Sequence, residues 1–254
     1  MMSSTSSGVY DTQDPVGAPV SALARLDTVW LHGAGLAGDT WGPITAGVAR
    51  AVTPDLPGHG RARLIKPPRV EAYADALSHL VPQDAVLIGH SLGGMVALEL
   101  AARLQDRVIA LVLIETVPTV RDRLSGRVSA SLASGLFQSI PLSWLAWLSG
   151  LGQSRETCTE LRRQMARMDR VRIAAALEAA ACYDGRPRLS QIGVPTLLIV
   201  GKQNTATHHG TALMAARIRG ARLVKLPGGH MLHTDNPVQL KRSIDDFLCR
   251  SLPN

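Results

Sequence analysis

The hydrophobic positions of this 254-residue chain follow two patterns that alternate along the sequence. Short apolar runs without polar alternation are typical of strands that are buried on both faces of a parallel sheet. Such runs lie at 28–31, 51–55, 85–89, 108–114, 196–200 and 221–226. Segments with helical spacing or content separate them, at 40–50, 70–80, 95–103, 211–218 and 237–250. The alternation predicts an α/β fold with a mostly parallel central sheet flanked by helices.

The alternation is interrupted between residues 116 and 193. No strand-like run occurs there, and apolar residues recur at helical spacing at Leu124, Val128, Leu132, Trp144, Trp147, Leu148, Leu161, Met165 and Met168. We predict three or four helices that form a cap at 116–193, inserted into a core domain made of 28–115 and 194–254. The apolar stripe is expected to pack the cap on the core, and the same residues can also border a substrate.

Residues 1–27 are rich in Ser, Thr, Gly, Pro and Asp, a composition typical of mobile segments. We predict a mobile tail there, with one weak edge strand near 20–26. The tail lacks the basic-then-apolar pattern of a signal peptide, and no apolar run approaches membrane-spanning length. The three cysteines, Cys158, Cys182 and Cys249, are odd in number and lack metal-ligand spacing. These features predict free thiols in a cytoplasmic protein that has no membrane partner.

The chemistry of the chain centres on Gly-His-Ser-Leu-Gly at 89–93, which joins a predicted strand to a predicted helix. In that context Gly-x-Ser-x-Gly places a serine in a strained turn with its hydroxyl clear of both elements. Side chains at Gly89 and Gly93 would collide there, so Ser91 is our candidate nucleophile. The N–H of Leu92 and the N–H of Ala34, in the loop His32-Gly33-Ala34-Gly35, are the candidate oxyanion donors.

A nucleophilic serine needs a base within reach. We assign this role to His230, which follows a predicted strand on a Gly-Gly loop. His233 is the alternative, although its place near the start of a helix favours a structural role. The remaining candidates are expected to be structural: His59, which is predicted in a surface turn flanked by glycines, and His79, His90, His208 and His209.

These motifs resemble the α/β-hydrolase superfamily, and most of all its small esterases, carbon–carbon hydrolases and carboxylesterases with a helical cap. The motifs are His32-Gly33-Ala34-Gly35, Asp55-Leu56-Pro57-Gly58-His59-Gly60, Gly89-His90-Ser91-Leu92-Gly93-Gly94 and Gly229-His230. The resemblance covers roughly residues 28 to 250 and implies Ser91 as nucleophile and His230 as base. It also implies Ala34 and Leu92 as oxyanion donors.

The chain departs from this family at the triad acid. The family's aspartate is expected a few residues after the strand at 197–200, where this chain has Asn204. Some members of the superfamily instead carry their acid where Glu115 ends the strand next to the nucleophile strand. We therefore expect Glu115 to be the acid, with Asn204 as the alternative. Asp235 is expected to be a helix cap, since either Asp235 or Asn236 is predicted as the N-cap of the helix at 237–250.

The resulting hypothesis is a serine hydrolase that cleaves a small, largely apolar ester, thioester or lactone through an acyl-enzyme on Ser91. A carbon–carbon hydrolase or a cofactor-free lyase would use the same residues, and a catalytically weak ligand-binding protein is the alternative from another class. No motif indicates a cofactor or a metal.

The charge of +7 does not indicate nucleic acid, because its excess lies in one internal segment. Between Thr116 and Gly193 there are 11 Arg and 6 Asp or Glu, a surplus of 11 − 6 = 5, and the Arg alternate with acidic and apolar residues. We expect a solvated helical face there and a small-molecule substrate. An acidic carrier protein is a further candidate partner.

Overall fold

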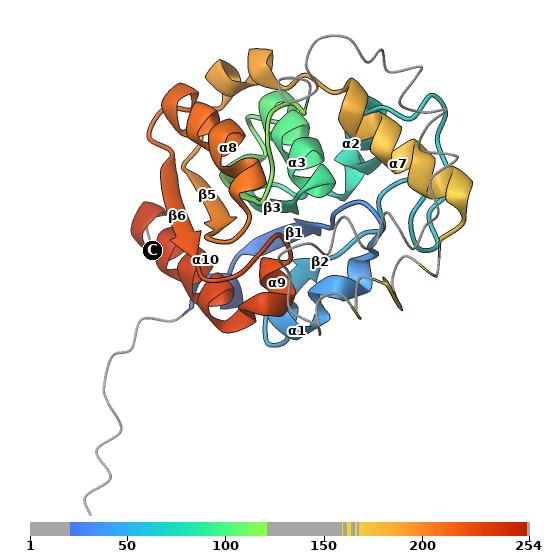
Figure 1. Cartoon of the computed structure of the whole chain (residues 1–254). Coiled ribbons are helices and arrows are strands. Elements are labelled where there is room, and N and C mark those ends of the chain that lie inside the picture. Colours follow the sequence, from blue (N-terminus) through green and yellow to red (C-terminus); the bar gives the residue numbers. More distant parts are fainter. Residues whose placement is uncertain (1–20, 121–158, 160–161, 164–165, 167, 253–254) are drawn as a thin grey trace, which may run out of the picture.

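The computed structural model describes residues 21–120, 159, 162–163, 166 and 168–252. Its centre is a six-stranded sheet in the order β2-β1-β3-β4-β5-β6, and every neighbouring pair is parallel (Figure 1). The strands are β1 (Asp27–Leu31), β2 (Arg50–Val52), β3 (Ala85–His90), β4 (Val108–Ile114), β5 (Thr196–Gly201) and β6 (Arg222–Leu226). This architecture confirms the predicted fold class.

The uniformly apolar runs form the middle of the sheet. β3 and β5 are buried at every residue, which is why their sequences show no polar alternation. The edge strand β6 differs, because its Arg222 and Lys225 are exposed. Charged side chains on an edge strand oppose pairing with another chain.

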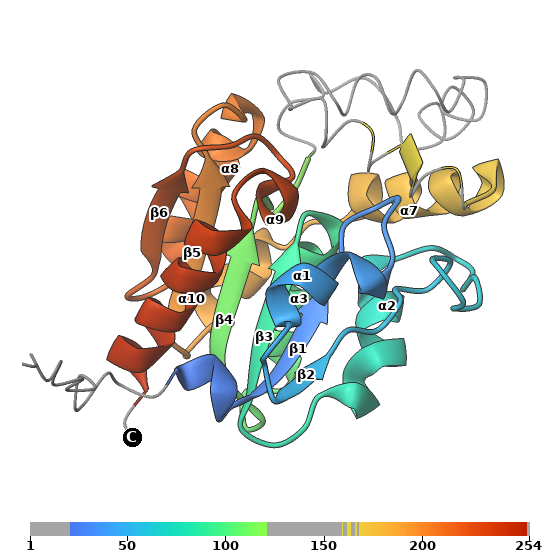
Figure 2. The ribbon, with the colours of Figure 1, turned by 90° about the horizontal axis from the view of Figure 1, so that it is seen from below.

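Helices cover both faces of the sheet (Figure 2). One core contains side chains of α2 (Val70–Leu77), α3 (Leu92–Arg103), α7 (Arg170–Cys182) and α8 (Thr205–Arg217). The opposite core contains side chains of α1 (Gly42–Thr45), α9 (Leu232–Asp235) and α10 (Pro237–Ser251). The described chain also contains the short 3-10 helices η1 (Ala22–Ala24), η2 (Gly38–Trp41), η3 (Ser78–Leu80) and η4 (Arg186–Gln191).

The edge strand predicted near 20–26 is wrong, because Ala22–Ala24 form the 3-10 helix η1. Ala22 and Leu23 are buried in the core that contains α10. The Ser21 hydroxyl and the Leu23 N–H both donate to Asp245 Oδ1, at 2.9 and 3.0 Å. This anchoring ties the segment before β1 to the last helix, so these residues do not belong to a mobile tail.

Two helix boundaries also differ from the sequence prediction. In the segment 40–50 only the end of η2 and the one-turn helix α1 are helical, and Gly47 follows with a φ of 78°. A left-handed glycine commonly ends a helix. α8 begins at Thr205 instead of residue 211, and its early start places Thr207 beside the site described below.

The predicted cap lies largely outside the described residues, including the apolar stripe from Leu124 to Met165. The described part of the cap contains the helices α7 and η4 and no strand. Met168 is buried. Among all the residues that the structure describes, no helix has the length and apolar character needed to span a membrane.

Candidate active site

Ser91 stands at a sharp turn between β3 and α3, with φ 53° and ψ −118°. Positive φ is strained for a residue with a side chain, and such strain concentrates at functional sites. The turn brings backbones into contact: a Cβ on Gly89 would lie 2.4 Å from the Gly93 carbonyl oxygen, and one on Gly93 would lie 2.3 Å from the Leu31 carbonyl oxygen. The two glycines therefore permit the turn that exposes the serine, as the sequence motif predicts.

The backbone around this turn supplies N–H groups. Leu92 is the first residue of α3, and the first N–H groups of a helix have no partner inside the helix. Ala34 lies between two glycines in the loop after β1, and Gly35 has a φ of 79°. Both Ala34 and Leu92 line the same pocket as Ser91, the place where an oxyanion would form.

His230 lies in the loop between β6 and α9 and also lines this pocket. The Asp235 carboxylate accepts the Gly229 N–H at 2.7 Å and so holds this loop. Asp235 therefore does not cap the last helix: the N-cap position of α10 is Asn236, which makes no side-chain cap bond. Of the two residues predicted as N-cap, Asp235 and Asn236, the structure therefore has Asn236 in that position.

The acid side of the site is built by Glu115, which follows β4 with a φ of 49° and a fully buried side chain. Asn204 Nδ2 and Thr207 Oγ1 each donate to Glu115 Oε2 at 2.6 Å. The Gly201 N–H donates to the other oxygen, Oε1. These three donors satisfy a carboxylate whose burial would otherwise be costly, and the N-terminus of α8 lies beside it.

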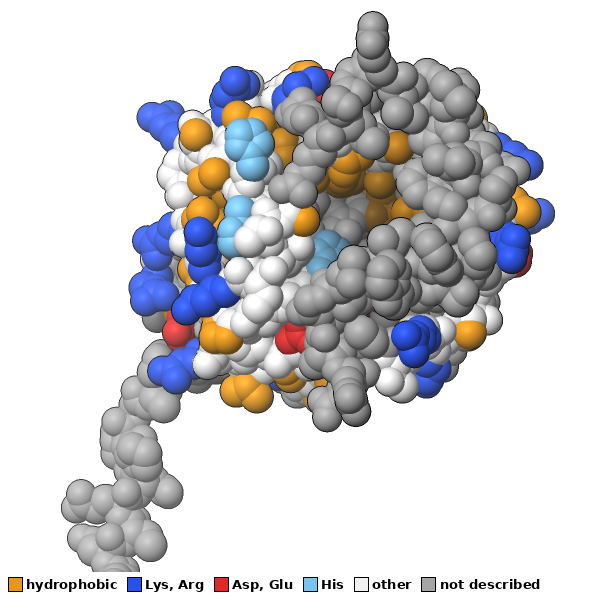
Figure 3. Space-filling view, in the orientation of Figure 1, with side chains coloured by type: hydrophobic (Ala, Val, Ile, Leu, Met, Phe, Trp, Pro, Cys, Tyr) orange, Lys and Arg blue, Asp and Glu red, His pale blue; other side chains and the backbone are white. Residues whose placement is uncertain are grey.

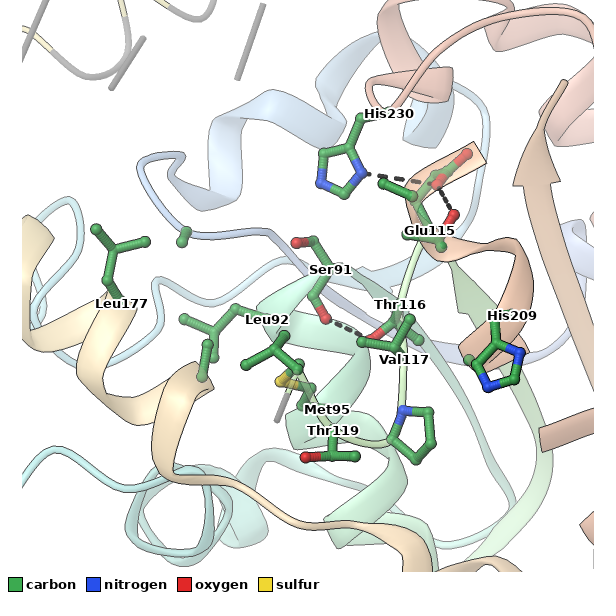
Figure 4. A pocket seen from close by; sticks show the side chains of 17 residues that line it. Ser91, Leu92, Met95, Glu115, Thr116, Val117, Thr119, Leu177, His209 and His230 are labelled. Carbon is green, nitrogen blue, oxygen red and sulfur yellow. Dashed lines mark hydrogen bonds and ion pairs between the residues drawn. The ribbon is translucent and has the colours of Figure 1, made fainter. Parts of the chain in front are cut away.

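His230 turns Nδ1 toward this acid (Figure 4). Nδ1 lies 3.6 Å from Glu115 Oε2 and 3.0 Å from Asn204 Nδ2. The fold thus places both candidate acid positions next to the same imidazole nitrogen. It does so because β4 and β5 are neighbours in the sheet and both end at this edge.

The pocket beside Ser91 has a volume of about 270 Å³. Apart from the residues named above it is walled mostly by apolar side chains, among them Met95, Val117, Pro118, Val120 and Leu177. The space-filling view shows a hollow with hydrophobic side chains on its wall and a histidine at its rim (Figure 3). An apolar pocket with a few convergent polar groups is typical of a small-molecule site.

Of the other histidines, His209 also lines the pocket, and the ring of His90 lies against that of His230. His233 is buried on α9, with its ring centroid 5.3 Å from that of Trp41. His59 is fully buried against His32, so its predicted place in a surface turn is wrong. Burial and the neighbouring His59 lower the pKa of His32 to about 3. Within the described ranges no group of His, Cys, Asp and Glu side chains is arranged to hold a metal ion.

Two contacts of the site were not anticipated from the sequence. Thr207 donates to Glu115, and it is recognisable in retrospect as the residue three positions after Asn204, on the same side of a helix. His90 reaches the backbone of His230, a contact between residues 140 apart that no local pattern indicates.

The model of the Alpha/beta hydrolase family matches residues 28–242, and the chain belongs to this family. It is 34% identical over 250 residues to the pimeloyl-(acyl-carrier protein) methyl ester esterase of Aromatoleum aromaticum, covering 89% of this chain and 99% of that protein. The protein of the same name from Chromobacterium violaceum is 31% identical over 198 residues, covering 72% and 78% of the two chains.

Solved structures agree on the fold. The enol-lactonase from Burkholderia xenovorans LB400 superposes with a TM-score of 0.76 at 23% identity, covering 88% of this chain and 91% of that chain. Together with the family and the relatives above, these findings confirm the predicted class of protein, a hydrolase that cleaves ester bonds.

Proposed function

We propose that the protein hydrolyses carboxylic esters through an acyl-enzyme on Ser91, with His230 as general base and Glu115 as the acid of the triad. The N–H groups of Ala34 and Leu92 form the oxyanion hole. The observation that carries this proposal is convergence: all five residues border one apolar pocket, although they come from four separate segments of the chain. Such convergence is the geometric criterion for a nucleophile, a base and an oxyanion site.

The choice of Glu115 over Asn204 follows from what each group can accept. A carboxylate only accepts hydrogen bonds, so the amide atom 2.6 Å from Glu115 Oε2 is the Asn204 nitrogen. That same nitrogen faces His230 Nδ1 at 3.0 Å and carries hydrogens, so it cannot accept a proton from the ring. Turning the amide over would bring its oxygen against the carboxylate. Of the two groups only Glu115 can accept from a protonated Nδ1, and its Oε2 lies 3.6 Å away, within ion-pair distance of an imidazolium but beyond hydrogen-bond distance.

The reaction follows from these roles. His230 Nε2 takes the proton of the Ser91 hydroxyl as the oxygen attacks the ester carbonyl, and the imidazolium is stabilised by Glu115. The tetrahedral oxyanion accepts hydrogen bonds from the two backbone N–H groups, each worth about 3–4 kcal/mol in the transition state. His230 then gives its proton to the leaving alkoxide. A water molecule, deprotonated by the same base, releases the acid and restores Ser91.

We propose an acyl chain with a small alkyl ester, presented by an acidic carrier protein, as the substrate class. Two relatives named as esterases of such a carrier-linked methyl ester span most of this chain. The apolar pocket wall suits an alkyl chain, and the net charge of +7 suits an acidic partner. The cytoplasm stays our prediction for the compartment, and the free thiol of Cys249 fits a reducing environment.

Active-site labelling with a fluorophosphonate, read by intact mass, tests the catalytic proposal. We expect one rapid adduct on the wild type, none on Ser91→Ala, and strongly slowed labelling of Glu115→Gln. Asn204→Ala should label much faster than Glu115→Gln, and the reverse order would move the acid role to Asn204. A wild type that is not labelled would favour the ligand-binding alternative.

The substrate class needs a separate comparison. The same dicarboxylic methyl ester is offered as a thioester on acyl carrier protein and on free pantetheine. We expect a lower KM for the carrier-linked ester, with the advantage shrinking as salt is added because exposed charges are screened. Equal KM values would reject the carrier and leave the esterase. Turnover of a carbon–carbon substrate with no turnover of either ester would favour the carbon–carbon hydrolase.

A further inference from the structure

His90 is the last residue of β3 and sits directly before the proposed nucleophile, with 1% of its surface exposed. Side chains alternate along a strand, so His90 shares a face with Val86 and Ile88. It leaves the sheet on the side of Trp41, whose ring centroid lies 6.5 Å from that of His90. The rings of His230 and His233 lie 4.9 Å away, which makes a buried aromatic cluster.

One nitrogen of this ring holds the loop of the proposed base. His90 Nε2 lies 2.8 Å from the backbone carbonyl oxygen of His230. A carbonyl only accepts, so Nε2 carries the hydrogen. Burial, together with the neighbouring His230 and His233, places the pKa of His90 well below its usual range. The ring is therefore neutral, with its hydrogen on Nε2 and a bare Nδ1.

The other nitrogen faces the proposed oxyanion loop. A Cβ on Gly33 would lie 2.7 Å from His90 Nδ1 and 3.3 Å from Ser91 Cβ. Nδ1 is buried and has no hydrogen-bond partner among the residues that the structure describes. The ring of His90 thus touches two active-site loops at once, while its backbone continues into the nucleophile turn.

We propose that His90 is a positioning residue that fixes the catalytic histidine loop relative to Ser91 through its Nε2–H bond to the His230 carbonyl. This inference rests on the proposed role of His230 as base. The loop before α9 carries two glycines, so its backbone has many conformations available. A displacement of about 1 Å between reacting groups costs on the order of 100-fold in rate. The Gly229 N–H bond to Asp235 holds the start of this loop, and the buried His90 donor ties His230 itself to the sheet beside Ser91.

A pair of amide substitutions separates positioning from packing. Gln places its NH₂ where His90 has Nε2, whereas the shorter Asn places it near Nδ1, out of reach of the His230 carbonyl. Both are polar amides in the same buried site, so their melting temperatures should fall by similar amounts. With a p-nitrophenyl ester we expect His90→Gln to keep kcat within about threefold of the wild type. His90→Asn should lose at least about tenfold in kcat with little change in KM.

The tautomer offers a readout that does not depend on activity. In the ¹⁵N–¹H spectrum of the full chain, His90 should show a protonated Nε2 and an unprotonated Nδ1. Neither signal should titrate between about pH 5 and 8, the range in which an ordinary histidine changes charge. A spectrum with the hydrogen on Nδ1, or one that titrates in this range, would overturn the proposal.

The kinetic measurements on the two His90 variants can also overturn the proposal. Equal losses of kcat in His90→Gln and His90→Asn, in proportion to their melting temperatures, would make His90 a packing residue only. A wild type that fluorophosphonate does not label would remove the proposed function, and the role of His90 in the reaction with it. A labelled wild type with two equally active His90 variants would reject the positioning role alone.

Discussion

The side-chain nitrogen of Asn204 lies 2.6 Å from Glu115 Oε2 and 3.0 Å from His230 Nδ1. Asn204 is also the N-cap residue of α8, yet its side chain makes no cap bond and turns into the site instead. An amide and a carboxylate have nearly the same shape. We propose that the ends of β4 and β5 share one carboxylate beside His230, which this chain carries at position 115 and not at position 204.

Glu115→Gln is expected to lower kcat by about 10²–10⁴, because a neutral amide leaves the imidazolium of His230 unstabilised. Its volume is almost unchanged, so the melting temperature should fall far less than activity does. Steady-state hydrolysis of a p-nitrophenyl ester, with thermal unfolding in parallel, measures both. A Glu115→Gln enzyme with near wild-type kcat would exclude Glu115 as the acid.

Exchanging the two groups should restore activity. In Glu115→Gln/Asn204→Asp the carboxylate sits at position 204, beside His230 Nδ1, and the new amide at position 115 becomes its donor. We expect at least a tenfold gain in kcat over Glu115→Gln alone. Asn204→Asp in the wild-type background should lose activity, since two carboxylates so close together cannot both stay charged. A double variant no better than Glu115→Gln would show that the acid cannot move between the strands.

Thr207 supplies the second donor to Glu115 Oε2, at 2.6 Å. Thr207→Val keeps the shape and removes the hydroxyl, so one donor to a buried charged group is lost. Such a bond is worth about 1.5–3 kcal/mol, and we expect urea unfolding to show a loss of that size with a several-fold fall in kcat. Thr207→Ser keeps the hydroxyl and is the matched control. Equal behaviour of the Val and Ser variants would contradict this role.

Local patterns in the sequence were enough to predict the parallel sheet, the nucleophile turn and the base loop. Unbroken apolar runs such as 108–114 predict buried strands. Gly-x-Ser-x-Gly predicts a sharp turn, because side chains at its two glycine positions would collide with the backbone. The strand order of an α/β sheet then brings Ser91, Glu115 and His230 to one edge. These predictions rest on residues that are close together in the chain or on a regular topology.

Contacts between distant residues could not be predicted in this way. The choice between Glu115 and Asn204 depends on which amide atom faces the carboxylate, and that is a property of packed side chains. Asp235 looked like a helix cap because it precedes α10, but its partner is the N–H of Gly229. The burial of His59 against His32 likewise depends on how two loops pack together.

Gly33→Ala is expected to disable the oxyanion side of the site. The new Cβ would lie 2.7 Å from His90 Nδ1 and 3.3 Å from Ser91 Cβ, so either the loop that carries Ala34 or the His90 ring must shift, and we expect the loop to move. Loss of one oxyanion donor costs about 10²–10³ in kcat, and fluorophosphonate labelling should slow by a similar factor. Gly42→Ala is the control, because its Cβ would meet nothing within 4 Å. Normal labelling of Gly33→Ala would contradict this prediction.

Stability should fall as the pH falls below neutrality, because buried histidines stay neutral in the folded state. His32 is fully buried, with a pKa lowered from 6.5 to about 3 by burial and by His59. Its Nε2 accepts the Leu56 N–H and its Nδ1 lies against the Gly33 carbonyl oxygen, so the folded ring has no place for a second proton. Between these two pKa values the unfolded chain binds a proton that the folded chain does not, and stability therefore rises with pH.

For a single such histidine the loss between about pH 7 and pH 5 is about 2 kcal/mol. Urea unfolding of His32→Asn at both pH values isolates this contribution, because the slope with pH is measured and not the absolute stability. We expect the variant to be less stable at neutral pH, through its lost hydrogen bonds, and to lose about 2 kcal/mol less than the wild type on acidification. Parallel pH dependences in the two proteins would mean that His32 binds a proton in the folded state as readily as in the unfolded chain.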